Sequence, residues 1–235
     1  MSPEKIEICD LGFRSLKISW NHLTSATIEF WDLETVTQLF QHASQMTYCS
    51  IVDPRLTPDF AVPSVIHRKL QTLSLHCRDQ ASHLPALVHR SSCSLTRIRF
   101  SGGVRQALDP LRDLRPLPGV TDLAVEQVFD SGVVKQLLLE GSYFPDLRHL
   151  TLQLRFFVVL WKEGCIPMML DPNRLDKMAL HKIIVVVPDL DADVINPMWI
   201  SKLRERLKGF QSSINLRQDG FEILIPEVLS RDDDS

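Results

Sequence analysis

A short pattern of apolar residues recurs along the chain at a nearly constant interval. Each copy has an apolar residue, two others, an apolar residue, one other and a third apolar residue. The seven copies are Leu23–Ala26–Ile28, Met46–Cys49–Ile51, Leu70–Leu73–Leu75, Leu95–Ile98–Phe100, Val120–Leu123–Val125, Leu147–Leu150–Leu152 and Leu175–Met178–Leu180. Their first members stand 23 to 28 residues apart. A period in the twenties is typical of stacked units that bury their apolar faces only against one another.

The residues within and between the copies predict two alternating element types. Each copy ends in strict alternation, which indicates a short strand with one buried face. Helical spacing follows several copies, most clearly in residues 32–43, where Leu33, Val36, Leu39 and Phe40 form a stripe after the N-capping Asp32. We therefore predict an α/β solenoid, with parallel strands on the concave face and helices on the convex face.

The period divides the chain into four parts. We expect a partial N-terminal unit around Leu16 and Ile18 in residues 1–22, about seven repeats in residues 23–187, a C-terminal cap with a helix in residues 188–228, and a mobile acidic tail in residues 229–235. Within the cap, Asn196 and Pro197 can start the helix, and a last strand is expected near Phe221. Residues 175–187 read as a strand that ends at Pro188.

The recurring pattern resembles that of leucine-rich repeat proteins, whose units carry Leu-x-x-Leu-x-Leu. The match extends over residues 23–180, and its irregular unit lengths are similar to the repeat region of fungal F-box-like proteins. In that family the repeats recruit a target protein, and a separate N-terminal F-box binds the Skp-type adaptor of a cullin ubiquitin ligase. The resemblance therefore implies an irregular leucine-rich-repeat solenoid that recruits substrate to such a ligase.

Two departures from the family limit what the resemblance implies. The family has Asn or Cys three residues after the last apolar position, where its side chain bonds the turn backbone. The equivalent residues here are Trp31, Pro54, Arg78, Gly103, Val128, Arg155 and Ile183. We therefore expect a stack that depends on apolar packing. The residues before Leu23 are also too few for an F-box, so adaptor binding is expected only if an F-box lies upstream.

Residues that flank the apolar positions of each strand are expected to face the concave side and to bind a partner protein. Arginine and tyrosine are common anchors in such interfaces, and small hydroxyls leave room for a partner. The predicted binding residues are Glu29, Tyr48, His76, Arg97, Arg99, Glu126, His149, Gln153, Lys177 and His181. The alternative is a set of solvated strand residues in which Arg97 and Arg99 pair with Asp122 or Glu126.

Nothing in the sequence indicates catalysis or a cofactor. There is no Gly-x-Ser-x-Gly elbow and no glycine-rich phosphate loop, so a hydrolase with a site among the loops is only a remote alternative. Cys77, His83, His89 and Cys93 match no zinc-ligand spacing, and no metal site is predicted.

Net charge and cysteine usage limit which kinds of partner and which cell compartment the sequence is compatible with. A net charge of −3 gives no general attraction to nucleic acid, and no apolar stretch reaches the roughly 20 residues that a membrane helix needs. Residues 1–13 carry four charged side chains and no signal core, and five irregularly spaced cysteines indicate a reduced protein of the cytoplasm or nucleus. The sequence thus predicts protein recognition, either for ubiquitin ligation or as a standalone interaction scaffold, with no nucleic-acid or membrane partner.

Overall fold

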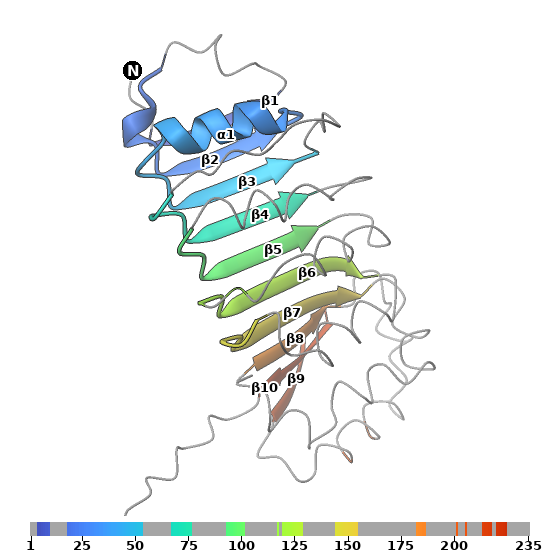
Figure 1. The fold of residues 1–235 in the computed structure, drawn as a ribbon. Helices are drawn as coiled ribbons and strands as arrows, with labels where there is room; N and C mark the ends of the chain where they lie inside the picture. Colours follow the sequence, from blue (N-terminus) through green and yellow to red (C-terminus); the bar gives the residue numbers. More distant parts are fainter. Residues whose placement is uncertain are drawn as a thin grey trace, which may run out of the picture.

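A single sheet of ten strands runs the length of the protein (Figure 1). The computed structural model describes residues 4–9, 18–53, 67–76, 93–101, 117, 119–128, 144–154, 182–186, 201, 205, 213–217 and 220–224. The strands are β1 (Lys5–Cys9), β2 (Ser25–Glu29), β3 (Tyr48–Val52), β4 (Thr72–His76), β5 (Arg97–Ser101), β6 (Asp122–Val128), β7 (His149–Leu154), β8 (Lys182–Val186), β9 (Ser213–Arg217) and β10 (Gly220–Leu224). Two helical elements have described bounds, η2 (Trp20–His22) and α1 (Leu33–His42), and Ser201 and Glu205 are also helical.

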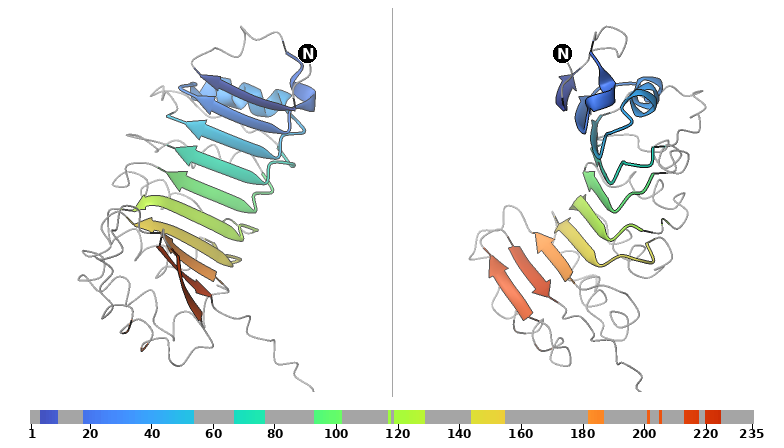
Figure 2. Two further views of the ribbon diagram at one scale, coloured as in Figure 1. Left: turned by 180° about the vertical axis from the view of Figure 1, so that it is seen from behind. Right: turned by 90° about the vertical axis from the view of Figure 1, so that its left-hand side faces the viewer.

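The first eight strands are parallel, and each pairs with the strand that follows it in the sequence. The chain therefore returns to the same end of the sheet after every strand, which is compatible with a repeat solenoid. The sheet bends along its length (Figure 2). The prediction that the segments near residues 28, 51, 75, 100, 125, 152 and 180 are consecutive parallel neighbours is confirmed for the first six. The seventh parallel neighbour in this series is Lys182–Val186, not the triplet near residue 180.

The apolar positions of the pattern form continuous buried columns across the strands. Ala26, Cys49, Leu73, Ile98, Leu123 and Leu150 face one another in register, and each is at most 2% exposed. A second column joins Ile28, Ile51, Leu75, Phe100, Val125 and Leu152, all of them buried except Phe100, which is half-buried. Burying one such side chain stabilises the fold by about 1.5–3 kcal/mol, so these columns are the main source of cohesion in the sheet.

A tight turn precedes β2, β3, β4 and β7 and extends the repeat beyond the triplet. The amide of the first triplet residue donates to the carbonyl three residues earlier, as in Leu23 to Trp20 (3.1 Å), Met46 to Ala43 (2.9 Å) and Leu147 to Phe144 (3.2 Å). The accepting residue is itself buried in each case. The full unit therefore has four buried positions, and the turn fixes where each strand begins.

His67 occupies this fourth position in one unit and connects it to the unit before. Its Nδ1 accepts the Leu70 amide at 3.2 Å, which leaves Nε2 to donate to the Ala43 carbonyl at 2.9 Å. The ring also meets the Phe40 ring edge-on, with centroids 5.7 Å apart. The buried imidazole is thus fully bonded within the stack, which is a structural role.

Helix α1 forms where the sequence predicts it and lies against one side of the sheet (Figures 1 and 2). The Asp32 carboxylate caps it by accepting the Thr35 amide at 2.6 Å, and Val36, Leu39 and Phe40 are buried. The other expected helical segments, within residues 81–88, 104–111 and 131–141, lie outside the described residues.

Both ends of the sheet differ from the sequence prediction. The N-terminal unit was expected around Leu16 and Ile18, but its strand is β1, where Ile6 and Ile8 pair with Ala26 and Ile28. Pro3 stands where the pattern requires a large apolar residue, so the triplet is incomplete there. At the other end, β10 forms close to where the last strand was expected and pairs antiparallel with β8. Strand β9, which was not expected, pairs antiparallel with β10 and extends the sheet. Of the helix expected after Pro197, the structure describes only Ser201 and Glu205.

The register of the last parallel strand, β8, also differs from the sequence prediction. The triplet pattern placed Met178 and Leu180 opposite Leu150 and Leu152, but these positions belong to Ile183 and Val185 of β8. The run of β-branched residues from Ile183 to Val187 has a higher strand preference than the mixed sequence around Met178. The triplet at residues 175–180 lies outside the described residues.

The buried columns predict how the protein responds to a single core deletion. Leu73 is 1% exposed between Cys49 and Ile98, so Leu73→Ala should lower the free energy of unfolding by about 2–5 kcal/mol, and Leu73→Asp should unfold the protein. Urea denaturation followed by circular dichroism measures both. Thr72→Ala, which changes the neighbouring residue on the other face, should stay within about 0.5 kcal/mol of the parent. Equal losses for Leu73→Ala and Thr72→Ala would show that the assignment of buried residues is wrong.

Candidate protein-binding face

The side of the sheet away from α1 carries the side chains that alternate with the buried columns. We call it the open face and define it by the alternating residues of β2 to β7. These are Ser25, Thr27, Glu29, Tyr48, Ser50, Val52, Thr72, Ser74, His76, Arg97, Arg99, Ser101, Asp122, Ala124, Glu126, His149, Thr151 and Gln153. Eight of the ten predicted binding residues are in this set, on six adjacent strands.

Register places the open-face side chains in straight rows across the sheet. One row joins Ser25, Tyr48, Thr72, Arg97, Asp122 and His149, and the next joins Thr27, Ser50, Ser74, Arg99, Ala124 and Thr151. Neighbours in a row are about 4.8 Å apart because that is the spacing of paired strands. Residues about 25 positions apart in the sequence therefore act as direct neighbours.

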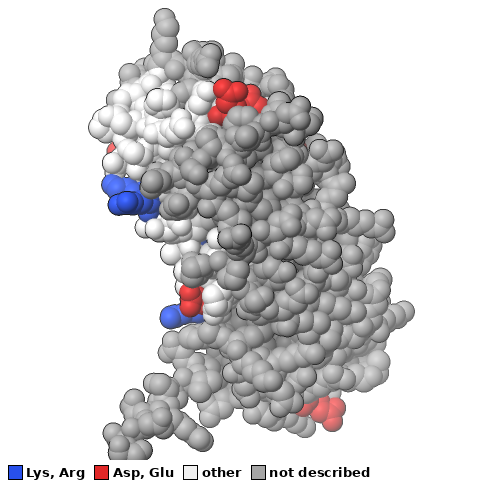
Figure 3. Space-filling view, in the orientation of Figure 1, with Lys and Arg blue, Asp and Glu red and all other residues white. Residues whose placement is uncertain are grey.

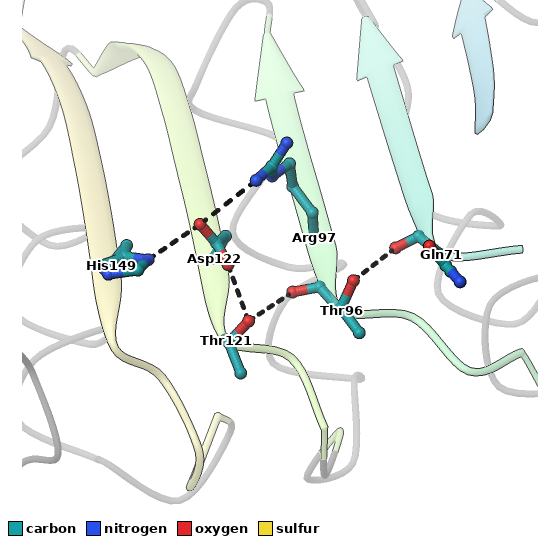
Figure 4. Close-up of polar contacts among 6 residues, drawn as sticks. All are labelled: Gln71, Thr96, Arg97, Thr121, Asp122 and His149. Atoms are coloured by element: carbon teal, nitrogen blue, oxygen red, sulfur yellow. Dashed lines mark hydrogen bonds and ion pairs between the residues drawn. The ribbon is translucent and has the colours of Figure 1, made fainter. Parts of the chain in front are cut away.

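Asp122 is the centre of a cluster that spans three strands (Figure 4). Its Oδ1 accepts from His149 Nδ1 at 3.0 Å and lies 3.6 Å from Arg97 Nη2, and its Oδ2 accepts from the Thr121 hydroxyl at 2.7 Å. A carboxylate can only accept, so the proton of the imidazole is on Nδ1. The cluster joins β5, β6 and β7 through a single carboxylate.

A second ion pair crosses the same strands. Arg99 donates to Glu126 Oε1 through both Nε, at 2.6 Å, and Nη2. The pairing of Arg97 and Arg99 with Asp122 and Glu126, one of the two outcomes left open by the sequence, is thus confirmed. Both arginine side chains nevertheless stay more than half exposed, at 61% and 56%. Pairing therefore does not remove them from the surface.

The surroundings of Asp122 lower the pKa of its carboxyl group. Partial burial alone would raise the pKa. The hydrogen bonds from Thr121 and His149 and the charges of His149 and Arg97 act in the opposite direction, and their sum prevails. The carboxylate is thus stabilised in its charged form, as its place among three donors requires.

Backbone carbonyls at the starts of the strands form a ladder along one edge of the open face. The Gln71 carbonyl accepts the amides of Thr96 and Arg97 at 2.9 and 3.0 Å, and the Thr96 carbonyl accepts those of Thr121 and Asp122 at 2.9 and 3.1 Å. The carbonyls of Glu4, Thr24, Thr47 and Thr121 accept two amides in the same way. Each carbonyl thus sets the position of the next strand with two bonds.

Threonine side chains reinforce this ladder. The hydroxyls of Thr24, Thr47, Thr96 and Thr121 each lie within hydrogen-bond distance of the carbonyl in the preceding unit, at 2.9 to 3.4 Å. Figure 4 shows the two steps from Gln71 through Thr96 to Thr121. The leucine-rich repeat pattern expects an asparagine ladder after the strands, and this chain instead has a threonine ladder before them. The signal was present in the sequence as threonine directly after the first triplet residue in four units.

The remaining predicted residues have more varied surroundings. Tyr48 is exposed, and Gln153 is half-buried. Glu29 accepts from the Cys9 thiol of β1 at 3.0 Å, and His76 Nδ1 lies 2.8 Å from the Ser101 hydroxyl. These contacts again join neighbouring strands.

Lys177 and His181 lie outside the described residues. The triplet pattern placed them opposite His149 and Gln153, and this prediction is wrong, since Lys182 and Val186 of β8 have those positions. The error follows from the shifted register of that strand.

Charged side chains also gather outside the open face, at the edge where the strands begin (Figure 3). Arg68 and Lys69 are exposed in the turn before β4, and Asp146 and Arg148 are exposed around the start of β7. The Asp146 carboxylate accepts the Gly119 amide of the preceding unit at 2.9 Å, so part of this edge is structural.

Comparison with known proteins gives no relative for this chain. No family model matches it, and neither a curated protein nor a solved structure matches it. In the part of the chain that the structure describes, no helix is long and apolar enough to cross a membrane. Within the same residues, no group of three His, Cys, Asp or Glu side chains is arranged to hold a metal ion. Of the four residues considered as zinc ligands, only Cys93 is described.

The lowered pKa of Asp122 predicts a pH dependence of stability. The carboxylate contributes to stability above the unfolded pKa, near the ordinary value of 3.8, and the contribution is lost as the pH falls through the lower folded value. Asp122→Asn should therefore be less stable than the parent above about pH 5, by under about 1 kcal/mol because the pair is screened by solvent, and the difference should shrink in acid. Urea midpoints at several pH values measure it. A difference that is unchanged in acid would mean that packing, and not charge, explains it.

The ladder predicts a graded response to threonine substitution. Thr47→Val removes one hydroxyl that donates to the Thr24 carbonyl, which keeps its two amide donors, so the loss of stability should be at most about 1 kcal/mol. The Thr121 hydroxyl, which has one proton to donate, lies nearer to Asp122 Oδ2, at 2.7 Å, than to the Thr96 carbonyl, at 3.3 Å. Thr121→Val therefore removes a bond to a charged group, so the loss should be larger, and the pKa of Asp122 should rise. Denaturation and NMR titration of the Asp122 carboxyl carbon test the two parts. Equal losses with no change in the Asp122 titration would contradict the proposed link.

Proposed function

We propose that this protein is a protein-binding module that recognises its partner on the open face. The supporting observation is the set of polar side chains held in register across six parallel strands, on the side of the sheet opposite α1. Because the paired strands already fix the backbone of the open face, no loop has to be ordered there on binding, and this lowers the entropy cost of association.

The dimensions of the open face suit an extended protein segment. Six strands at about 4.8 Å spacing give a length of about 24 Å, and a five-residue strand adds a width of about 16 Å. An extended segment of about seven residues crosses that length. Tyr48 supplies an exposed aromatic ring, and Arg97 and Arg99 supply guanidinium groups; both side-chain types are enriched among binding anchors.

We further propose that the stack is a leucine-rich repeat solenoid that recruits the substrate of an F-box-type ubiquitin ligase. The recurring triplet and the sequential parallel strand order support the repeat assignment. The ligase role depends on the resemblance to fungal F-box-like proteins. Its test is co-purification of a Skp-type adaptor with the protein as encoded by its complete gene; a standalone scaffold would bind its partner without the adaptor.

A bulky side chain placed in the middle of the open face should block partner binding. Ser74 is half-buried between Ser50 and Arg99, so Ser74→Trp places a large ring in the middle of the open face, on the side away from the core. We expect proteins that co-purify with the parent to fall at least about tenfold with this variant, measured by quantitative mass spectrometry. The matched control is Gln41→Trp on the exposed side of α1, which should leave them unchanged. Equal recovery with both variants, at equal stability, would contradict binding on the open face.

A further inference from the structure

Charge is distributed unevenly over the open face. Between Glu29 on β2 and Asp122 on β6, the open-face positions of β3, β4 and β5 hold hydroxyls, Val52, His76 and the two arginines, and none of them is a carboxylate. The row neighbours of Arg97 and Arg99 on β4 are Thr72 and Ser74. On the side that faces β4, the arginines therefore present positive charge beside neutral hydrogen-bonding groups.

The two arginines differ in how firmly they are held. Arg99 makes two hydrogen bonds to one carboxylate oxygen of Glu126. Arg97 approaches Asp122 only at 3.6 Å, beyond ordinary hydrogen-bond length, and 61% of its side chain is exposed. Figure 4 shows one end of its guanidinium directed at Asp122 and the rest directed away from the cluster.

Asp122 does not depend on Arg97 for its hydrogen bonds. Thr121 and His149 donate to its two oxygens at 2.7 and 3.0 Å. If Arg97 turns toward another acceptor, the Asp122 carboxylate keeps both donors and is not left unsatisfied. The cost of releasing Arg97 is thus the loss of one exposed ion pair, which is small in solvent.

From these observations we propose that Arg97 is the anchor for a carboxylate on an acidic segment of the partner, which lies across β3, β4 and β5. The proposal rests on the open face being the binding surface and names the chemistry of what binds there. The guanidinium binds the partner carboxylate, and the hydroxyls of Thr72, Ser74 and Tyr48 are placed to bond neighbouring polar groups. Asp122 acts as an internal competitor that holds Arg97 until the partner arrives.

A fluorescent hexaglutamate peptide is the probe for this chemistry, with hexaglutamine as the uncharged comparison. The whole chain carries a net charge of −3, so general electrostatics opposes an acidic peptide and binding reports a local site. Fluorescence anisotropy at low salt should detect hexaglutamate, with an affinity that falls as salt is added, and should detect no hexaglutamine.

Two substitutions in the cluster should change this affinity in opposite directions. Arg97→Gln should weaken hexaglutamate binding at least about fivefold, and Asp122→Asn should strengthen it because the internal competitor is lost. The double variant should bind as weakly as Arg97→Gln alone. Arg68→Gln, the same charge change at an exposed turn residue off the open face, should stay within about twofold of the parent.

Melting temperatures within a few degrees of the parent establish that each variant is folded. Equal affinities for Arg97→Gln and Arg68→Gln would overturn the proposal, as would weaker binding by Asp122→Asn or no binding of hexaglutamate by the parent. None of these results decides the role of the open face itself, because the Ser74→Trp comparison with natural partners tests that separately. If Ser74→Trp loses its natural partners while Arg97→Gln binds hexaglutamate as the parent does, the open face remains the proposed binding surface and the acidic segment is rejected.

Discussion

The carbonyl that accepts two amides from the next unit determines most of what is described above. It recurs before the parallel strands, as at Gln71 and Thr96, and it fixes the position at which each new strand starts relative to the last. Side chains in a strand alternate between faces, so a shift of one residue would exchange the buried column with the open face. The register that places Leu73 in the core therefore also places Arg97 beside Asp122.

If the open face binds a partner as proposed, cohesion and recognition are divided between the two faces of the sheet. The apolar columns contribute about 1.5–3 kcal/mol per buried side chain, whereas an exposed ion pair contributes under about 1 kcal/mol. The pairs Arg97–Asp122 and Arg99–Glu126 thus add little to a fold that the columns already hold together. The Arg99–Glu126 pair orients a long side chain through two hydrogen bonds, whereas the longer contact with Asp122 leaves Arg97 able to turn toward another acceptor.

Alternation within a triplet was enough to predict the six central strands and the face on which Arg97, Arg99 and Glu126 lie. The prediction from alternation failed at the two ends of the sheet. At β8 a β-branched run outweighs the triplet around Met178, and at β1 the triplet lacks its first apolar member because residue 3 is proline. The pairing of Asp122 with His149, and the link through Thr121, depend on distances between strands that no local pattern contains.

The arrangement around Asp122 also shows how a neutralised arginine can remain available for binding. A buried ion pair is costly to break because the remaining charge has lost its solvation. Here the arginine is mostly exposed, and the carboxylate has two other donors, so neither group is stranded when they separate. In the absence of a partner, Asp122 keeps the positive charge of Arg97 partly neutralised, which disfavours weak binding of small anions. To displace Asp122, a partner carboxylate has to approach Arg97 more closely than the 3.6 Å of the present ion pair. A peptide segment that is aligned by the hydroxyls on β4 meets this requirement more easily than a simple ion does.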